Sequence, residues 1–294
     1  MRRTSPILSA TLDCLSAVAP KTRFFDKQLS TLQFLIAHGR LPEMRPLLND
    51  ALFRIKTSDE ILRPERVFTS DKELAKEFIR QRIDERHVVP SLAVLRSKQE
   101  IRDFTFPQRC VIKPTHTSGD VVLRHGGERV DMAKILGWMD KNYYRSWREV
   151  NYRYLAPKII VEPFVFDADT ADDMKIFCFR GKARVIHWDF DRGSAISRML
   201  YTRDWQPLDA SLKYPVATKQ KARPANLDAM IEAAECLASP FDLVRIDMYT
   251  NDVDFHVGEI THVAGNATNP FLPPSAEERV SALLFVEDPP GTQT

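Results

Sequence analysis

The sequence predicts an α+β fold built on antiparallel sheets, and three patterns support that prediction. Residues 109–114 form a short apolar run that ends at a proline, as a buried strand does. Residues 174–179 and 184–190 alternate in polarity on either side of Arg180-Gly181-Lys182, which is typical of a β-hairpin. Helices and strands do not alternate regularly along the chain, so a doubly wound parallel sheet is not expected.

The first 66 residues are expected to form a helical segment. They are rich in leucine and interrupted by prolines. Apolar residues recur at the spacing of short amphipathic helices, as in 34–36 and 47–55. No residues with site chemistry occur here. The segment is therefore expected to pack on the rest of the fold, to recognise substrate or to dock a partner.

The middle of the chain mixes helix and strand patterns. Thr69-Ser70-Asp71 is a typical helix start, because Ser and Asp cap exposed backbone N–H groups, so a helix is expected over residues 72–83. A turn at 115–119 follows the apolar run and leads into a second strand at 121–125. Apolar residues at helical spacing predict a helix over 131–150.

The last part of the chain predicts further strands and one helix. Residues 158–165 are expected to form a strand, and Pro224 is expected to open a helix. Residues 243–250 and 255–261 are expected to form two strands joined at Asn251-Asp252. The final residues, 289–294, are expected to be a disordered tail.

Composition indicates an ordinary soluble protein. The chain has 294 residues with a net charge of +2 at pH 7, which gives no indication of nucleic-acid binding. No apolar run reaches the length of about 18 residues that a membrane span needs. Asp13 interrupts the apolar N-terminal stretch, so a signal peptide is not expected. Four cysteines without a CxxC pair predict free, mostly buried thiols in a reducing, cytoplasmic compartment.

Standard catalytic and nucleotide signatures are absent, which leaves lysines and carboxylates at strand ends as candidates. Lys113 ends the first apolar run, and the turn after it carries hydroxyls and Gly119. A lysine beside such a turn suits a phosphate group. The alternative is a lysine that is simply exposed at a strand end.

Two acids on the last pair of strands could hold a metal ion. Within 243–250, Asp247 lies on the face opposite the apolar one, together with Arg245. Glu259 lies on the partner strand. Carboxylate oxygens are ligands that Mg²⁺ prefers, and it keeps other positions for phosphates. The alternative is two solvated acids at a sheet edge, because the register of the strands is not fixed by the sequence.

Two further charges stand in apolar strands. Glu162 interrupts the run at 158–165, where it could accept a hydrogen bond from a ligand amine or pair with a nearby lysine or arginine. Lys175 lies in the first hairpin strand among phenylalanines. It could face a ligand or extend its ammonium group to the surface.

Taken in order, these segments resemble the ATP-grasp superfamily, and within it the TupA-like branch linked to teichuronopeptide and other surface-polysaccharide synthesis. The resemblance covers residues 69–265. It is carried by the segments SDKELAKEFIRQRI, VVPSLAVLRSKQEI, CVIKPTHTSGDVVL, IIVEPFV, DMKIFCFRGKARVIHWDFDR, MLYTRDWQPL, LVRIDMY and VGEIT.

The resemblance implies a nucleotide held between two α+β lobes, with ATP and Mg²⁺ as cofactors. The implied division is a helical segment at 1–66, an N-terminal lobe at 67–160, a C-terminal lobe at 161–288 and the tail. Implied ATP contacts are Lys72, Lys113, Thr117, Ser118, Gly119, Glu162, Pro163, Phe164 and Val165. Implied γ-phosphate or acyl-phosphate contacts are Lys175, Arg192 and Arg198, and implied metal ligands are Asp247 and Glu259.

The implied activity is ATP-dependent ligation of a carboxylate to an amine through an acyl phosphate. The implied substrates are a sugar acid or peptide of a bacterial surface polysaccharide and an amino acid or other amine. Peripheral association with a membrane polysaccharide-assembly complex would follow. A kinase acting on a hydroxyl, a glycosyltransferase and a non-catalytic binding subunit remain as alternatives.

Overall fold

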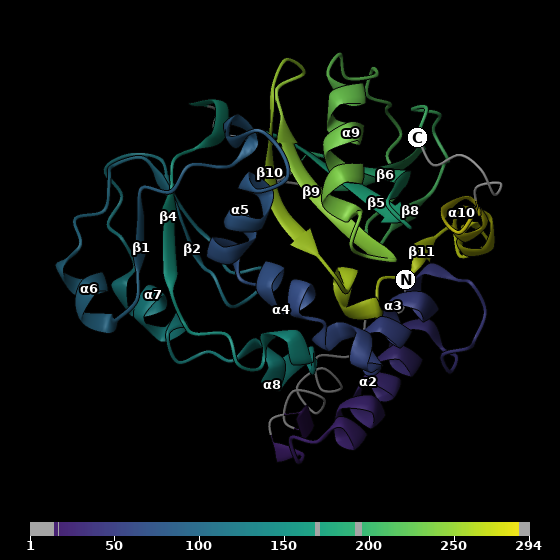
Figure 1. Cartoon of the computed structure of the whole chain (residues 1–294), viewed down its shortest axis with the longest axis horizontal. Coiled ribbons are helices and arrows are strands. Elements are labelled where there is room, and N and C mark those ends of the chain that lie inside the picture. The colour runs from purple at the N-terminus through teal and green to yellow at the C-terminus, as the bar shows by residue number, and fades with distance from the viewer. Residues whose placement is uncertain (1–14, 17, 168–170, 192–195, 288–294) are drawn as a thin grey trace.

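The computed structural model describes residues 15–16, 18–167, 171–191 and 196–287. Two antiparallel sheets dominate it and lie on the two sides of Figure 1. The four-stranded sheet has the order β1-β4-β2-β3, with strands β1 (Ala93–Leu95), β2 (Cys110–Pro114), β3 (Val122–Arg124) and β4 (Ile159–Glu162). The five-stranded sheet has the order β10-β9-β5-β6-β7, with strands β5 (Asp172–Phe179), β6 (Lys182–Phe190), β7 (Ser197–Thr202), β9 (Leu243–Thr250) and β10 (Phe255–Thr261).

Helices surround the two sheets. The described helices are α2 (Arg23–His38), α3 (Leu48–Thr57), α4 (Pro64–Ser70), α5 (Lys72–Arg80), α6 (Lys98–Asp103), α7 (Met132–Trp138), α8 (Tyr143–Trp147), α9 (Leu227–Ala238) and α10 (Ala276–Leu284). A small two-stranded sheet joins β8 (Ser211–Leu212) to β11 (Phe271–Leu272). The predicted hairpin of β5 and β6, the paired strands β9 and β10 and the α+β class are confirmed.

Local chemistry explains where the elements begin and end. The Asp71 carboxylate accepts hydrogen bonds from the backbone N–H groups of Glu73 and Leu74, so α5 begins where the sequence predicts. Strand β4 ends at Glu162, earlier than predicted, where Pro163 follows and has no N–H to continue the ladder. Helix α9 begins at Leu227 rather than at Pro224.

The single helix expected over residues 131–150 is wrong. The structure has α7 and α8 separated by residues 139–142, and a short 3₁₀ turn follows at Val150–Tyr152. Asn142 has an extended backbone at φ −129°, and its side chain donates to the carbonyl of Arg153. Asparagine competes for backbone hydrogen bonds in this way, and the pattern of apolar residues does not reveal it.

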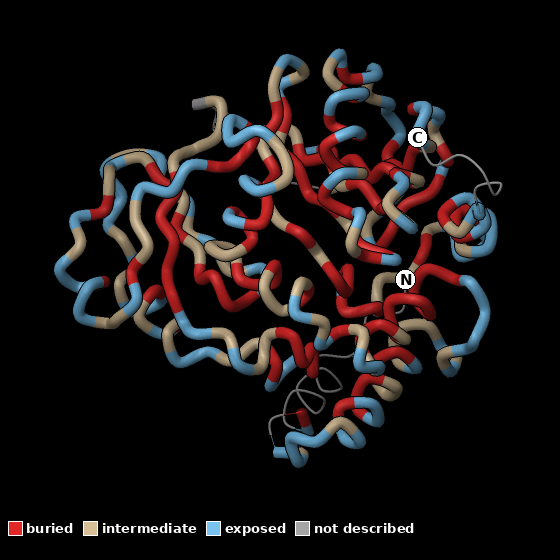
Figure 2. Tube along the Cα trace, viewed as in Figure 1, coloured by how far each residue is buried: buried red, intermediate tan, exposed pale blue. Residues whose placement is uncertain are grey.

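The five-stranded sheet is buried on both faces. One face packs against α5 and α9 around residues such as Ile176, Ile246 and Met248. The other packs against α3 and α10 around Phe177 and Leu200. Figure 2 shows buried chain running through these central strands. The four-stranded sheet has a separate apolar cluster on one face only, formed with α6 and α7.

The expected domain boundaries and the expected buried cysteines can be compared with the structure. Helix α4 spans the expected boundary at 66/67 and β4 spans the one at 160/161, and the division into domains stays a prediction. Among the described cysteines, Cys110 and Cys178 are buried free thiols and Cys236 is a free thiol that is exposed. Within the described ranges, no helix has the length and apolar character of a membrane span.

Candidate functional site

A cavity of about 530 Å³ is lined by residues of both sheets, and most of the predicted site residues meet in it. Its lining includes the predicted residues Lys72, Lys113, Ser118, Gly119, Glu162, Pro163, Phe164, Val165, Lys175, Asp247 and Glu259. Residues from β2, β4, β5, β9 and β10 therefore converge although they lie far apart in the sequence.

The two predicted metal ligands are direct neighbours across β9 and β10. Glu259 is the register partner of Asp247, and the register shifts between Val257 and Glu259, which marks a β-bulge. Gly258 occupies the bulge. A Cβ there would lie 2.8 Å from a ring carbon of Tyr249, so any larger residue would have to displace that ring.

The bulge determines which face Glu259 occupies. Directly paired residues of antiparallel strands point to the same face. In a regular register continued from Val257, Gly258 would pair with Asp247 and Glu259 with Ile246, which lies in the apolar cluster beneath α9. With the bulge at Gly258, the Glu259 side chain lies beside Asp247 on the cavity face. The sequence alone does not fix this register, and the structure brings the two carboxylates together.

Arg245 holds the carboxylate pair in place, and it is not among the site residues predicted from the sequence. Its Nε and Nη2 each donate to Asp247 at 2.6 Å, and Nη2 lies 3.9 Å from Glu259. Thr261 donates to Glu259 at 3.0 Å. One feature of the sequence could have identified Arg245 as a site residue: the alternation of strand residues places it on the same face as Asp247.

The pair suits a magnesium ion that is completed by other ligands. Burial raises the pKa of Asp247 to about 7, although Arg245 opposes the shift, and Glu259 adds to it. The site is thus short of positive charge. The described residues include no group of three or more His, Cys, Asp or Glu that could hold a metal. Mg²⁺ commonly takes one or two carboxylates together with waters and phosphates, so the residues fit it.

On the opposite wall, Lys113 forms part of a buried charge cluster. Its Nζ donates to Glu162 at 2.8 Å, and Lys76 lies 2.6 Å from the other oxygen of Glu162. Burial alone would lower the pKa of Lys113, but Glu162 raises it above its usual range. Of the two alternatives for Glu162, the structure has the ion pair with a lysine. A contact with adenine stays a proposal.

Lys175 enters the cavity from β5 and is fixed by two acids. Its Nζ lies 2.6 Å from Asp173 and 2.9 Å from Asp189. Arg198, expected beside it, does not line the cavity. It donates instead to Asp189 at 2.6 Å and so holds the carboxylate that contacts Lys175. Arg192 lies outside the described residues.

The expected phosphate loop closes one side of the cavity. Lys72, the first residue of α5, donates from Nζ to the carbonyl of Thr117, and burial lowers the pKa of its ammonium group. Ser118 and Gly119 line the cavity, and Gly119 has a φ of +85° that favours glycine. The Thr117 side chain is buried and donates to Asp120 instead of facing the cavity.

Known proteins identify the family. The sequence model of the TupA-like ATP-grasp family matches residues 53–284. No curated protein matches the chain. Among solved structures, the D-alanine–D-alanine ligase from Bacillus anthracis complexed with ATP is 14% identical over 68% of this chain and 56% of that chain, with a TM-score of 0.41.

Two further solved structures show a similarly weak likeness. The D-alanine–D-alanine ligase from Helicobacter pylori is 14% identical over 76% of this chain and 61% of that chain, with a TM-score of 0.39. The ATP-grasp ligase PsnB complexed with its minimal precursor is 14% identical over 68% and 53%, with a TM-score of 0.36. The chain thus spans less than two thirds of the length of each of these ligases.

The family match covers most of the chain and includes every predicted site residue. It confirms the resemblance stated from the sequence, and with it the ATP-grasp fold of the α+β class. On this basis, the chain belongs to the TupA-like ATP-grasp family.

Proposed function

We propose that the chain is an ATP-dependent carboxylate–amine ligase that uses ATP with Mg²⁺. One observation carries the proposal: a single cavity brings together three lysines and a pair of carboxylates. Lys72, Lys113 and Lys175 supply positive charge, and Asp247 and Glu259 supply oxygen ligands. This is the combination that transfer of a phosphoryl group needs, because catalysis of that step rests on positioning and charge neutralisation.

Each part of the cavity has a task in this proposal. Lys72 and Lys113 contact the phosphates, and the loop at Ser118 and Gly119 covers them. Lys175 faces the transferred phosphoryl group. Asp247 and Glu259 would hold Mg²⁺, which when bound neutralises charge on the phosphate oxygens. The segment 162–165 lines the nucleotide's side of the cavity.

The reaction has two steps. A substrate carboxylate oxygen attacks the γ-phosphorus, the bond to the β-phosphate oxygen breaks, and ADP leaves. The substrate ammonium group loses a proton, and the resulting neutral amine attacks the acyl phosphate at its carbonyl carbon. Inorganic phosphate leaves with the electron pair of the broken C–O bond, and the nitrogen loses a second proton, to the leaving phosphate or to solvent, as the amide forms. The enclosing walls exclude water, which would otherwise hydrolyse the acyl phosphate.

The proposed substrates rest on the family resemblance. We propose a sugar acid or peptide of a bacterial surface polysaccharide as the carboxylate, and an amino acid or similar amine as its partner. Support comes from the TupA-like resemblance rather than from the cavity, because a fold does not fix a substrate. A cytoplasmic location and peripheral association with a membrane assembly complex belong to the same proposal.

Thermal unfolding with and without Mg-ATP tests the nucleotide site. Ligand at about 100 times its Kd stabilises a fold by about 2.7 kcal/mol, so a clear shift is expected that disappears without Mg²⁺. Asp247→Asn should lose most of it, whereas Asp103→Asn, on the exposed surface of α6, should retain it. An absent shift in the wild type at millimolar Mg-ATP would refute nucleotide binding by the free chain.

Product analysis then tests the reaction type. A ligase releases ADP and inorganic phosphate together only when a carboxylate and an amine are both present. A kinase would leave the phosphate on its product. Consumption of a sugar nucleotide without ATP would identify a glycosyltransferase and contradict the proposal.

A further inference from the structure

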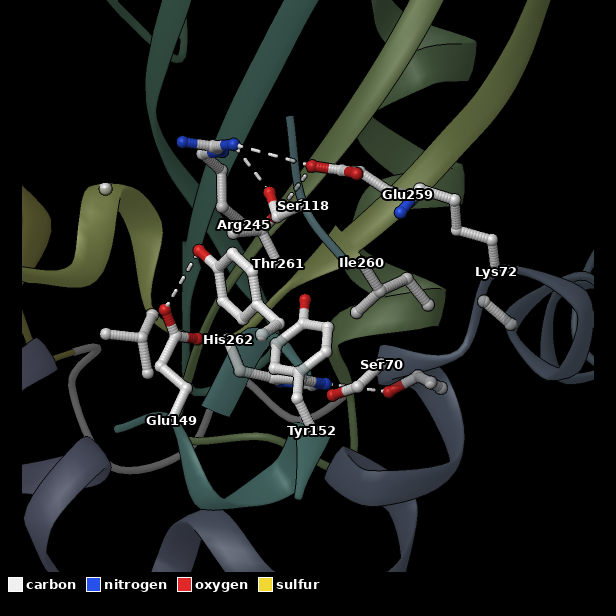
Figure 3. Close-up of a pocket in the computed structure, with 15 residues that line it drawn as sticks. Ser70, Lys72, Ser118, Glu149, Tyr152, Arg245, Glu259, Ile260, Thr261 and His262 are labelled. Atoms are coloured by element: carbon white, nitrogen blue, oxygen red, sulfur yellow. Dashed lines mark hydrogen bonds and ion pairs between the residues drawn. The ribbon is translucent and has the colours of Figure 1, made fainter. Parts of the chain in front are cut away.

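A second, smaller cavity of about 100 Å³ adjoins the first. The two cavities share Lys72, Ser118, Arg245 and Glu259 in their linings. The smaller one is also lined by a set of side chains that the proposed reaction has not used: Tyr143, Glu149 and Tyr152. Figure 3 shows Glu149 and Tyr152 across this cavity from Arg245 and Glu259.

Glu149 is a buried acid with little to neutralise it. Its residue is 4% exposed, and its carboxylate receives one hydrogen bond, from the Tyr143 hydroxyl at the long distance of 3.5 Å. Across the described part of the chain, no lysine or arginine lies within 4.0 Å of it. Burial raises the pKa of this carboxyl group to about 7, so its ionised form is costly and a cationic group placed beside it would favour that form.

Nearby cations are engaged elsewhere. Lys56 is buried, and its positive charge lowers the pKa of Glu149 at longer range. Its Nζ, however, donates a hydrogen bond to Gln33 at 3.2 Å. Arg245 is bound to Asp247 through two hydrogen bonds. The ammonium group of Lys72 donates to a loop carbonyl.

The remaining groups around the acid carry no positive charge. Burial pushes the pKa of His262 well below its usual value, which keeps this ring neutral. Burial also raises the pKa of the Tyr143 and Tyr152 hydroxyls well above their usual value, so both stay protonated. The wall around Glu149 therefore offers one carboxylate and two neutral hydroxyl oxygens as acceptors.

We propose that the smaller cavity binds the amine substrate, with the Glu149 carboxylate accepting hydrogen bonds from the substrate's ammonium group. A primary ammonium group has three donors and no acceptor, which matches a carboxylate flanked by hydroxyl oxygens. The shared wall places this amine beside Glu259, next to the expected position of the phosphates. The inference rests on the proposed ligase function and assigns the nucleophile's place within it.

The size of the cavity restricts what enters. A volume of about 100 Å³ holds a group of a few atoms, so it takes the amine end of a substrate and not a polymer. A substrate carboxylate is disfavoured there, because Glu149 and Glu259 would both repel it. The carboxylate to be activated must therefore approach from the larger cavity.

Binding of small amines to three variants tests this assignment. The probes are methyl esters of glycine, alanine and lysine, each paired with its N-acetyl counterpart blocked at every amine. Thermal unfolding is measured with and without saturating Mg-ADP. We expect at least one ester to stabilise the wild type saturably and its acetylated form not to do so. Glu149→Gln should weaken that binding at least tenfold and keep the full Mg-ADP shift.

Two controls separate the possible outcomes. Glu232→Gln makes the same chemical change on the exposed side of α9 and should bind as the wild type does. Tyr143→Phe keeps the charge of Glu149 and removes its hydroxyl partner, so it should weaken the binding of the amine a few-fold. This variant also keeps the test open if Glu149→Gln does not fold.

Several results would overturn the inference. These are undiminished ester binding by Glu149→Gln, equal binding of acetylated and free amines, or no ester binding by a chain that responds to Mg-ADP. A melting temperature of ligand-free Glu149→Gln several degrees below that of Glu232→Gln would instead give Glu149 a structural role. An absent Mg-ADP response in the wild type would refute the proposed function alone, since the esters are also measured without nucleotide.

Discussion

The two sheets that enclose the larger cavity are stabilised in different ways. The five-stranded sheet is packed with apolar side chains on both faces. The four-stranded sheet has an apolar cluster on one face only, and its other face presents Lys113 and Glu162 to the cavity. Its strands are also shorter, at three to five residues against six to nine.

Under the proposed function, the different packing of the two sheets suits two different tasks. Carboxylates that hold a metal need a fixed distance, and Asp247 and Glu259 stand on the doubly packed sheet. Groups that close over a nucleotide need freedom to move, and Lys113 and the loop at Ser118 and Gly119 belong to the lightly packed one. Regions with fewer buried apolar contacts open more easily, which suits this second task.

The largest predicted effect concerns the charge cluster on the lighter sheet. Glu162→Gln leaves Lys76 and Lys113 without their buried partner, so the free energy of unfolding at pH 7 should fall by about 3–5 kcal/mol. Urea denaturation measures this. Glu77→Gln, which alters an exposed ion pair on α5, should change it by less than about 1 kcal/mol.

The same variant should alter the dependence of stability on pH. Burial would raise the pKa of Glu162, but the two lysines lower it below its usual value. Such a group contributes stability above its unfolded pKa of about 4.3, and the contribution is lost as the pH falls through the folded pKa. Glu162→Gln should therefore lose less stability than the wild type on acidification, and an equal loss would contradict this account.

Truncation of apolar side chains compares the two sheets directly. Ile246→Ala removes a fully buried side chain from β9 and should cost about 2–5 kcal/mol in unfolding free energy. Leu123→Ala, on β3 where the residue is 49% exposed, should cost less than about 0.5 kcal/mol. Urea denaturation of both variants checks the difference, and similar costs would contradict the unequal burial of these two positions.

The next prediction concerns the affinity for nucleotide. Lys72→Met removes a buried ammonium group beside the loop, so the Kd for Mg-ADP should rise about 10–100-fold. Isothermal titration calorimetry measures it. Lys27→Met, on the exposed side of α2, is the matched control and should bind as the wild type does. An unchanged Kd for Lys72→Met would remove this residue from the phosphate site.

The smallest predicted effect tests the loop. Gly119→Ala forces an alanine into a backbone with φ of +85°, which costs about 1–2 kcal/mol. The substitution should therefore weaken the binding of Mg-ADP several-fold. Gly127 follows strand β3, has open space around it and has no positive φ, so Gly127→Ala should be neutral. Equal calorimetric binding by both variants would show that nucleotide does not depend on the shape of this loop.

The sequence predicts most of the fold because its signals are local. The cap at Asp71, the hairpin around Gly181 and the alternation in β9 each depend on neighbouring residues, and all three appear in the structure. The long helix over 131–150 fails because Asn142 interrupts it, and apolar periodicity does not report such an interruption.

The site is predicted less completely because its geometry depends on distant contacts. Arg198 carries the right charge but turns toward Asp189 and leaves the cavity. Alternation places Arg245 on the strand face of Asp247, but only the folded chain shows that it lies against both carboxylates. Glu149 lies inside the range wrongly predicted as one helix, so only the folded chain shows that it lies beside the site.

The glycine bulge in β10 gives this site an unusual relation to changes in chain length. Removal of Gly258 would place Glu259 directly after Val257, and regular pairing would keep it opposite Asp247 on the cavity face. Closure of the bulge without loss of a residue would instead pair Glu259 with Ile246 and turn it toward the apolar side of the sheet. In alignments of related sequences, a gap at this glycine is therefore compatible with a retained pair of carboxylates.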